Sequence, residues 1–463
     1  RCIVLSLAFF FLKLVLNNYK LPNLEDCSVA IIGLGYVGLP LAMRISQQNI
    51  CLLTKKNIIR KVVAYDINSL RINELNKGFD RNKLFSKNEF KSIRNLIFSD
   101  EKKLLINCDI FIVTVPTPID HEKNPNLKFL KEASKIVGES IKKSKGKEFN
   151  KIVIYESTVY PGLTEEICIP IVEKESGLIF DSKSKQNTFY CGYSPERINP
   201  GDKKHTLNSI VKITSGCNLV VASWIDKFYG SFIKAGTFKA TSIKVAEAAK
   251  IIENTQRDIN IALVNELSML FKKINIDTQE VLEAASTKWN FHRYTPGLVG
   301  GHCIGVDPYY LTYKSQQIGF SVNLISSGRV INDYMHEYLF QQIIVQINKQ
   351  KEKNILFLGI SYKSNCSDIR NSQLINLIKN LKKKVLEITL VDPNINKEEV
   401  FKETGIMALN KIPRNKKYSI ILFGLYHDQF KELSKNNFKE YCLKNTIIFD
   451  LTNKIKGANI IHF

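Results

Sequence analysis

One glycine-rich motif near the N-terminus constrains the fold of this chain more than any other feature. The apolar run 28–32 is followed by Gly33-Leu34-Gly35-Tyr36-Val37-Gly38 and then by a helix-forming stretch, residues 39–48. A strand, a G-x-G-x-x-G turn and a helix in this order are typical of a Rossmann domain that binds a dinucleotide. The glycines allow a pyrophosphate to approach the N-terminus of the helix. The residues expected at the cofactor are Gly33, Gly35, Tyr36, Val37 and Gly38.

An acidic residue completes this predicted dinucleotide site. The next predicted strand, residues 61–65, ends at Asp66. A carboxylate at this point accepts hydrogen bonds from the ribose 2′-hydroxyl, so it favours NAD over NADP. Gly38 and Asp66 are 28 positions apart (66 − 38), whereas this unit usually needs about 20. The excess falls at residues 49–59 and is interpreted as a surface insertion or an error in the gene model.

The remaining pattern predicts an α/β protein. Two further apolar runs end in polar residues at the edge where parallel sheets bind ligands, and they supply Pro116, Thr117 and Thr158. Residues 241–273 contain no Pro or Gly and predict one long helix. The predicted architecture is two Rossmann-like doubly wound domains joined by a long central helix. The predicted strands are residues 28–32, 61–65, 110–115, 152–155, 188–191, 355–360, 387–391, 419–424 and 446–451.

Length and pattern together predict the domain organisation, because 463 residues are too many for one compact core. We expect an N-terminal extension at residues 1–26, an NAD-binding Rossmann domain at 27–225, a central helical domain at 226–335, and a C-terminal Rossmann-like domain at 336–463. Residues 3–16 are apolar but shorter than the roughly 20 residues that span a bilayer. We interpret them as an extension or a mis-set start rather than a membrane anchor.

Charge and cysteine content narrow the class of protein. The net charge is +22, but the lysines are spread along the chain instead of forming a basic patch, so we expect no nucleic-acid partner. Such a field attracts anionic small molecules such as dinucleotides and nucleotide sugars. The ten cysteines include no C-x-x-C pair and no Cys/His cluster at metal-ligand spacing. We therefore expect no metal site, no disulfide framework and a cytoplasmic protein.

The glycine-rich stretch 297–308 presents one thiol, Cys303, with a carboxylate four residues later at Asp307. A cysteine in such a loop is a covalent nucleophile if it is reachable and its pKa is lowered. The alternative is a buried cysteine beside a tight turn.

Two further sets of polar residues are candidates for the same chemistry. Lys250 and Asn254 lie one turn apart on the predicted long helix, so they share a face. A lysine beside an amide stabilises an oxyanion, although both residue types are also common on solvated helix faces. In Ser194-Pro195-Glu196-Arg197, Glu196 is either an acid/base group or an ion-pair partner of Arg197.

In this order, these motifs resemble the UDP-glucose/GDP-mannose dehydrogenase family, whose members oxidise the C6 alcohol of a nucleotide sugar to a carboxylate with two NAD. The resemblance runs from about Cys27 to the C-terminus. Segments 155–162, 194–202 and 287–296 look most like dehydrogenases of UDP-N-acetylhexosamines, which supply uronates for capsules and other surface polysaccharides. The resemblance implies two Rossmann domains, NAD as cofactor, a UDP-sugar substrate, and a homodimer or higher homo-oligomer. It also implies that the C-terminal domain, residues 336–463, binds UDP.

The resemblance also implies roles for individual residues. Cys303 is the implied nucleophile, which forms a thiohemiacetal and then a thioester, while Lys250 and Asn254 stabilise the oxyanions. Glu196 and Asp307 are implied in proton transfer, and Thr158 in holding a water molecule. The implied substrate-binding residues are Glu196, Arg197, Lys250, Asn254, Phe291, Tyr294, Gly300, Gly301, Lys363 and Arg370; Phe291 and Tyr294 could instead be plain core residues.

Three other functions stay open at this point. Within the family, UDP-glucose and UDP-N-acetylmannosamine are alternative substrates to UDP-N-acetylglucosamine and UDP-N-acetylgalactosamine. A two-electron dehydrogenase of the β-hydroxyacid type would share the lysine and asparagine but needs no thiol. A non-catalytic protein that binds NAD or a nucleotide sugar would bind without turnover.

Overall fold

The computed structural model describes residues 19–82, 84–91, 93, 95–144, 150–182, 186–198, 205–385, 387–431, 433, 440–455 and 460–462. The apolar run 3–16 and residues 199–202 lie outside them. The chain divides into two compact units, Arg1–Ile252 and Glu253–Phe463. No helix among the described residues is long and apolar enough to cross a membrane.

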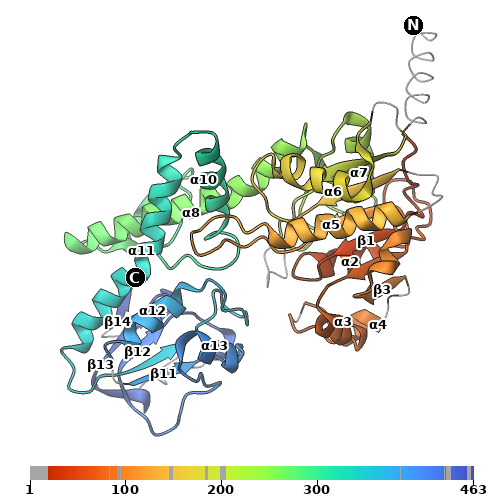
Figure 1. Cartoon of the computed structure of the whole chain (residues 1–463). Coiled ribbons are helices and arrows are strands. Elements are labelled where there is room, and N and C mark those ends of the chain that lie inside the picture. The colour runs from red at the N-terminus through yellow and green to blue at the C-terminus, as the bar shows by residue number, and fades with distance from the viewer. Residues whose placement is uncertain are drawn as a thin grey trace. The chain divides into compact units, whose positions relative to one another are not determined.

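The first unit is built on a parallel sheet in the order β3-β2-β1-β4-β5-β7-β6. Figure 1 shows this unit, with β1 and β3 labelled. Its strands are β1 (Val29–Ile32), β2 (Val62–Tyr65), β3 (Leu96–Ser99), β4 (Ile110–Val113), β5 (Lys151–Tyr155), β6 (Ile179–Phe180) and β7 (Thr188–Tyr193). A separate parallel pair is formed by β8 (Lys212–Thr214) and β9 (Thr237–Lys239). Every residue of β1, β2, β4, β5 and β7 is buried, as expected for parallel strands covered on both faces.

Helices cover this sheet and set its binding edge. They are α2 (Gly38–Gln47), α3 (Ser69–Asn76), α4 (Lys87–Lys91), η1 (Lys102–Asn107), α5 (Lys128–Lys143), η2 (Thr164–Cys168), α6 (Ile169–Ser176) and α7 (Leu219–Gly230). Residues of α2 and α7 share one apolar cluster with alternate residues of β1, β2, β4 and β5. The chain leaves β1 toward β2 on one side and later adds β4 on the other, so the strand order reverses between β1 and β4. Ligands of doubly wound sheets bind at this reversal.

The long helix predicted at residues 241–273 is α8 (Ile243–Lys273). The second unit continues with α9 (Thr278–Ala285), α10 (Asp307–Gln317) and α11 (Asn323–Ile347). The segment between α9 and α10 has no regular helix or strand and contains the predicted cysteine loop.

The second unit also contains a five-stranded parallel sheet in the order β11-β10-β12-β13-β14. Its strands are β10 (Asn354–Leu358), β11 (Glu387–Val391), β12 (Tyr418–Phe423), β13 (Cys442–Asp450) and β14 (Ile460–His462), with the helices α12 (Gln373–Lys382), α13 (Lys397–Thr404) and η3 (Asp428–Phe430). The strands predicted near residues 355, 387, 419 and 446 are present. The prediction of two Rossmann-like sheets and a long helix is confirmed.

The excess at residues 49–59 folds back onto the first unit. Ile50 and Asn57 form an antiparallel bridge, and the N–H of Leu52 donates to the carbonyl oxygen of Ser231 at 2.9 Å. Cys51 is fully buried, whereas Ile50 is 52% exposed. The segment is thus a surface excursion whose base is hydrogen-bonded to the body of the unit.

Candidate active site

The glycine loop after β1 forms a backbone cradle. Gly33 has a φ of +96°, and a Cβ on Gly38 would lie 1.9 Å from the carbonyl oxygen of Gly33. A Cβ on Gly35 would meet nothing within 4 Å, so open space adjoins the start of α2. The first turn of α2 has no acidic residue and no side-chain cap. Tyr36 and Val37 are half-buried between these glycines. This arrangement fits the pyrophosphate of a dinucleotide.

Asp66 lies beside this loop at the end of β2. Its Oδ2 accepts a hydrogen bond from the N–H of Leu34 at 2.7 Å, and its Oδ1 accepts one from the N–H of Asn68 at 2.9 Å. The residue is half-buried, so part of it faces solvent. A ribose hydroxyl could donate to this carboxylate once the pyrophosphate lies on the glycine loop.

Other predicted cofactor residues follow the neighbouring strands. Pro116 and Thr117 come after β4, and Thr158 comes after β5. Because β1, β4 and β5 are adjacent and parallel, these residues leave the sheet at the same edge as the glycine loop. Pro116 is exposed, and Thr117 and Thr158 are half-buried.

The predicted nucleophile lies in a turn that leads directly into a helix. The carbonyl oxygen of Cys303 accepts hydrogen bonds from the N–H groups of Val306 at 3.0 Å and Asp307 at 2.8 Å. Asp307 is the first residue of α10. Cys303 is exposed, so the alternative of a buried structural cysteine is wrong.

Asp307 is joined to the long helix through Asn254. The Nδ2 of Asn254 donates to Oδ2 of Asp307 at 2.6 Å, and these residues are 8% and 2% exposed. Lys250, one turn earlier on α8, is 7% exposed. Burial of both α8 residues excludes the solvated-face interpretation. The structure therefore brings Asn254, Asp307 and the cysteine turn together.

In the first unit, Glu196 belongs to a buried ionic network that the sequence does not reveal. The Nζ of Lys212 lies 3.1 Å from Oε2 of Glu196 and 2.9 Å from Oε2 of Glu156. The hydroxyl of Tyr229 donates to the other oxygen of Glu156. Lys212 is 3% exposed and Glu156 is 2% exposed. Glu196 therefore has Lys212 as an ion-pair partner.

Burial and charge shift the pKa values of Glu156 and Lys212 in this network. Burial raises the pKa of Glu156, although Lys212 partly offsets this effect. Burial alone would lower the pKa of Lys212, but Glu156 and Glu196 raise it. The lysine thus stays charged between two acids.

Backbone groups fix Glu196 from its other side. Its Oε1 accepts hydrogen bonds from the N–H groups of Arg197 at 2.6 Å and Ile198 at 2.8 Å. The Nη1 of Arg197 donates to the carbonyl oxygen of Val211 at 3.1 Å. Glu196 is therefore held in one orientation by backbone donors and a buried cation.

The predicted substrate loop in the second unit is packed closely against residues 361–372. A Cβ on Gly300 would lie 2.6 Å from the carbonyl oxygen of Asn371, and a Cβ on Gly301 would lie 2.6 Å from Cδ2 of Tyr362. Gly301 also has a φ of +86°, which favours glycine. Any side chain at these positions would push the two loops apart.

Charged residues of segment 361–372 form an ion pair with each other and lie close to His302, the residue before the cysteine. Asp368 accepts a hydrogen bond from Nη2 of Arg370 at 2.6 Å, and Nε2 of His302 lies 3.4 Å from the same carboxylate. Burial would raise the pKa of Asp368, but the hydrogen bond from Arg370 and the neighbouring His302 lower it. Burial and the charge of Arg370 lower the pKa of His302. Lys363 is half-buried.

The aromatic residues before the cysteine loop do not belong to the core. Phe291 is 38% exposed, and Tyr294 is half-buried. Their exposure leaves them accessible to a ligand, so the plain-core interpretation is wrong for Phe291.

The fold and the cradle define a class of protein: an NAD-dependent oxidoreductase with two Rossmann sheets. The chain belongs to the UDP-glucose/GDP-mannose dehydrogenase family. The NAD-binding domain model of this family matches residues 27–230, its central domain model matches 244–334, and its UDP-binding domain model matches 356–457.

Individual relatives cover nearly the whole chain. A UDP-N-acetyl-D-glucosamine 6-dehydrogenase from Salmonella typhi is 46% identical over 93% of this chain and 96% of its own. One from Pseudomonas aeruginosa is 44% identical over 92% and 97%. Among solved structures, a UDP-D-ManNAc dehydrogenase from Pyrococcus horikoshii superposes with a TM-score of 0.79 at 28% identity, and it covers 94% of this chain and 98% of its own.

Proposed function

We propose that this chain oxidises the C6 alcohol of a UDP-N-acetylhexosamine, UDP-N-acetylglucosamine or UDP-N-acetylgalactosamine, to the uronate through a thioester on Cys303. The relatives that support an N-acetylglucosamine substrate are 44–46% identical. In this proposal residues 27–225 bind NAD and residues 336–463 bind the UDP moiety.

The observation that carries the proposal is the contact between Asn254 and Asp307. Its Nδ2–Oδ2 distance is 2.6 Å, and Asp307 in turn donates its N–H to the carbonyl oxygen of Cys303 at 2.8 Å. A buried amide and a buried carboxylate thus lie on one hydrogen-bonded path to the backbone of the residue that carries the exposed thiol. Covalent capture of an aldehyde needs these groups: a nucleophile, a proton acceptor and an oxyanion donor.

NAD, when bound, accepts a hydride from C6 in each of two successive oxidations. Between them, the thiolate of Cys303 adds to the C6 aldehyde, and a thiohemiacetal forms. Loss of the second hydride converts it to a thioester. Lys250 and Asn254 donate to the oxygen that carries negative charge in these steps.

Hydrolysis then releases the uronate and restores the thiol. Asp307 accepts a proton from the attacking water, because its carboxylate is fixed by Asn254 and is two percent exposed, shielded from bulk solvent. Glu196 transfers the remaining proton, and Thr158 holds a bridging water. Phe291, Tyr294, Gly300, Gly301, Arg197, Lys363 and Arg370 bind the nucleotide sugar.

The test is an NADH assay across UDP-glucose and the three UDP-N-acetylhexosamine epimers. We expect two NADH per sugar, with an N-acetylated sugar preferred. One NADH per sugar would indicate the β-hydroxyacid type of dehydrogenase. NAD binding without turnover of any UDP-hexose would indicate the non-catalytic alternative.

We also propose a homodimer or higher homo-oligomer in the cytoplasm. Leu263 and Leu270 lie seven positions apart on one face of α8 and are 53% and 50% exposed, and exposed apolar faces mark association surfaces. A reducing compartment keeps the exposed Cys303 as a thiol. Light scattering should give a mass at least twice the 52.9 kDa of the chain.

A further inference from the structure

The sheet of the second unit has the same arrangement of a glycine and an aspartate as the sheet of the first unit. Each first strand is followed by a glycine at positive φ, +96° for Gly33 and +81° for Gly359. Each second strand is followed by an aspartate, Asp66 or Asp392, 33 residues after the glycine (66 − 33 and 392 − 359). Oδ2 of each aspartate accepts the N–H of the residue after that glycine, at 2.7 and 2.8 Å. The two sheets therefore carry the same acid at the same place.

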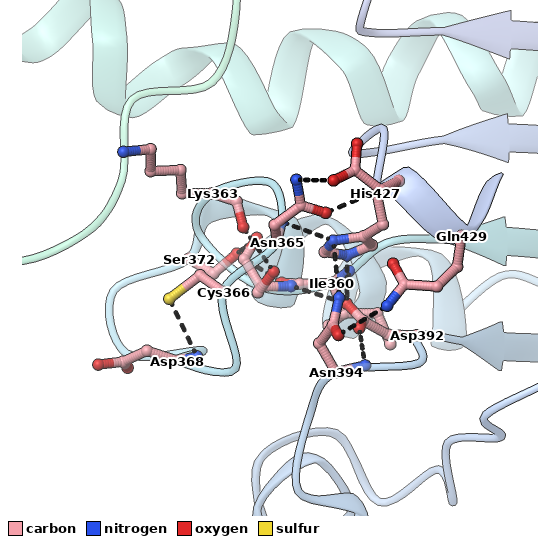
Figure 2. A network of polar contacts seen from close by, with 12 residues as sticks. Ile360, Lys363, Asn365, Cys366, Asp368, Ser372, Asp392, Asn394, His427 and Gln429 are labelled. Atoms are coloured by element: carbon pink, nitrogen blue, oxygen red, sulfur yellow. Dashed lines mark hydrogen bonds and ion pairs between the residues drawn. The ribbon is translucent and has the colours of Figure 1, made fainter. Parts of the chain in front are cut away.

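Asp392 differs from Asp66 in its burial and in its hydrogen-bond partners. Asp66 is half-buried, whereas Asp392 is fully buried. Nε2 of His427, which is also fully buried, lies 3.0 Å from Oδ2 of Asp392 (Figure 2). The other oxygen, Oδ1, accepts the N–H of Asn394 at 2.9 Å. Because Asp392 is fully buried and Asp66 is not, the carboxylate of Asp392 presents no surface to a ribose hydroxyl.

Asp392 stays ionised in this setting. Burial would raise its pKa, but the hydrogen bond from His427 and the backbone N–H of Ile360 lower it. The charged acid fixes the ring of His427, because Nε2 must carry the proton that Asp392 accepts.

The opposite nitrogen of His427 holds a loop. Its Nδ1 lies 2.9 Å from the backbone nitrogen of Asn365 and accepts that N–H. Asn365 has a φ of +59° and exchanges two hydrogen bonds with Asp428: Nδ2 donates to Oδ2 at 3.0 Å, and the N–H of Asp428 donates to Oδ1 at 2.9 Å. The turn at Asn365 is thus pinned from two sides.

This pinned loop carries Lys363. Ser361 donates its N–H to Asp392 at 3.3 Å and its hydroxyl to the carbonyl oxygen of Lys363 at 2.9 Å. Lys363 therefore lies between two anchors, Ser361 and Asn365, that both lead to the His427–Asp392 pair. Figure 2 shows its side chain extending away from this pair.

We propose that His427 and Asp392 are positioning residues for nucleotide-sugar binding. The carboxylate of Asp392, which would otherwise bind a second dinucleotide, holds His427, and His427 fixes the loop that carries Lys363. The proposal rests on the assignment of Lys363 to the nucleotide sugar. It implies that each chain binds one NAD. It also implies that the affinity for UDP depends on the hydrogen-bond acceptor that Nδ1 of His427 offers to the loop.

Two substitutions separate the two nitrogens of the ring. His427→Asn places an amide oxygen near Nδ1, so the N–H of Asn365 keeps an acceptor. His427→Gln places an amide nitrogen near Nε2, so Asp392 keeps a donor but the loop loses its acceptor. His462→Asn is the matched control, because His462 lies 3.6 Å from the buried Asp450 of the same sheet but does not contact the loop.

The measurement is the Kd of UDP alone and of NAD alone by calorimetry. We expect His427→Gln to weaken UDP binding about tenfold, or ~1.4 kcal/mol, with NAD affinity unchanged, and His427→Asn and His462→Asn to change UDP binding less than about threefold. NAD should bind at one site per chain in each protein.

Several outcomes would overturn the proposal. They are an unchanged UDP Kd in a folded His427→Gln variant, equal weakening by both His427 variants, and two NAD per chain. If both His427 variants fail to fold, Asp428→Ala at the exposed side of the turn replaces them. The proposal then requires that Asp428→Ala weakens UDP binding and leaves the affinity for NAD unchanged. Wild-type protein that binds UDP but oxidises no UDP-sugar would refute the proposed function and leave the positioning role standing.

Discussion

Replacement of Lys212 by methionine would leave two carboxylates without their shared cation. Its Nζ lies within 3.1 Å of both Glu156 and Glu196, and all three side chains are less than 10% exposed. Methionine keeps most of the volume, so the change removes charge rather than packing.

The expected loss of stability follows from this burial. Breaking a buried ion pair by removing one partner costs about 3–5 kcal/mol, because the remaining charge is uncompensated. For a unit of this size each kcal/mol corresponds to roughly 2–4 °C in Tm. We therefore expect the unfolding transition of the first unit to fall by roughly 10 °C. Lys244→Met is the control: Lys244 pairs with Glu166 at 3.7 Å, but both side chains are more than 40% exposed, so its loss should cost about 1 kcal/mol or less.

Differential scanning calorimetry of the single and double variants tests the cause. Glu156→Gln removes one negative charge and keeps an acceptor for Tyr229. If uncompensated charge is the cause, Lys212→Met combined with Glu156→Gln should be more stable than Lys212→Met alone. A Lys212→Met variant as stable as the Lys244→Met control would refute the reasoning, as would a double variant no more stable than the single one.

Three further predictions concern reactivity, pH and cofactor choice. Iodoacetamide at neutral pH should label the exposed Cys303 and not Cys27, because burial raises the pKa of Cys27 to about 12; peptide mass spectrometry that finds Cys27 labelled first would contradict this. Burial raises the pKa of Glu247 to about 7, so folding stability should fall as pH rises from about 4.5 toward 7, and Glu247→Gln should flatten that slope in urea titrations. Asp66→Ser should raise the KM for NAD about tenfold and reduce the preference for NAD over NADP, because a hydrogen bond to a charged group is lost. Unchanged kinetics would show that Asp66 does not belong to the cofactor site.

The strands were predictable from sequence where burial is complete. β1, β2, β4 and β5 lie within two residues of their predicted bounds at either end, because fully buried parallel strands read as unbroken apolar runs. The short strands β6, β8, β9 and β14 have two or three residues each and were not predicted, and neither was β3, which is only partly buried. Such strands are defined by their partners rather than by a local pattern.

The candidate site likewise contains residues that the sequence reveals and residues that only the fold reveals. The cysteine loop and the Lys250 and Asn254 pair are visible in sequence because their residues lie within a few positions of one another. Lys212 is 56 positions from Glu156 (212 − 156), and nothing near it in the sequence indicates burial between two acids. Only the fold brings them together.

The most direct test of the central claim is the covalent state of Cys303 during turnover. Wild-type protein is mixed with NAD and UDP-N-acetylglucosamine, quenched in acid, digested and analysed by mass spectrometry. We predict that the peptide containing Cys303 gains the mass of the UDP-sugar acyl group, only when NAD is present, and that Cys303→Ala forms neither adduct nor uronate. Complete oxidation by Cys303→Ala, with two NADH per sugar and no adduct, would contradict the account.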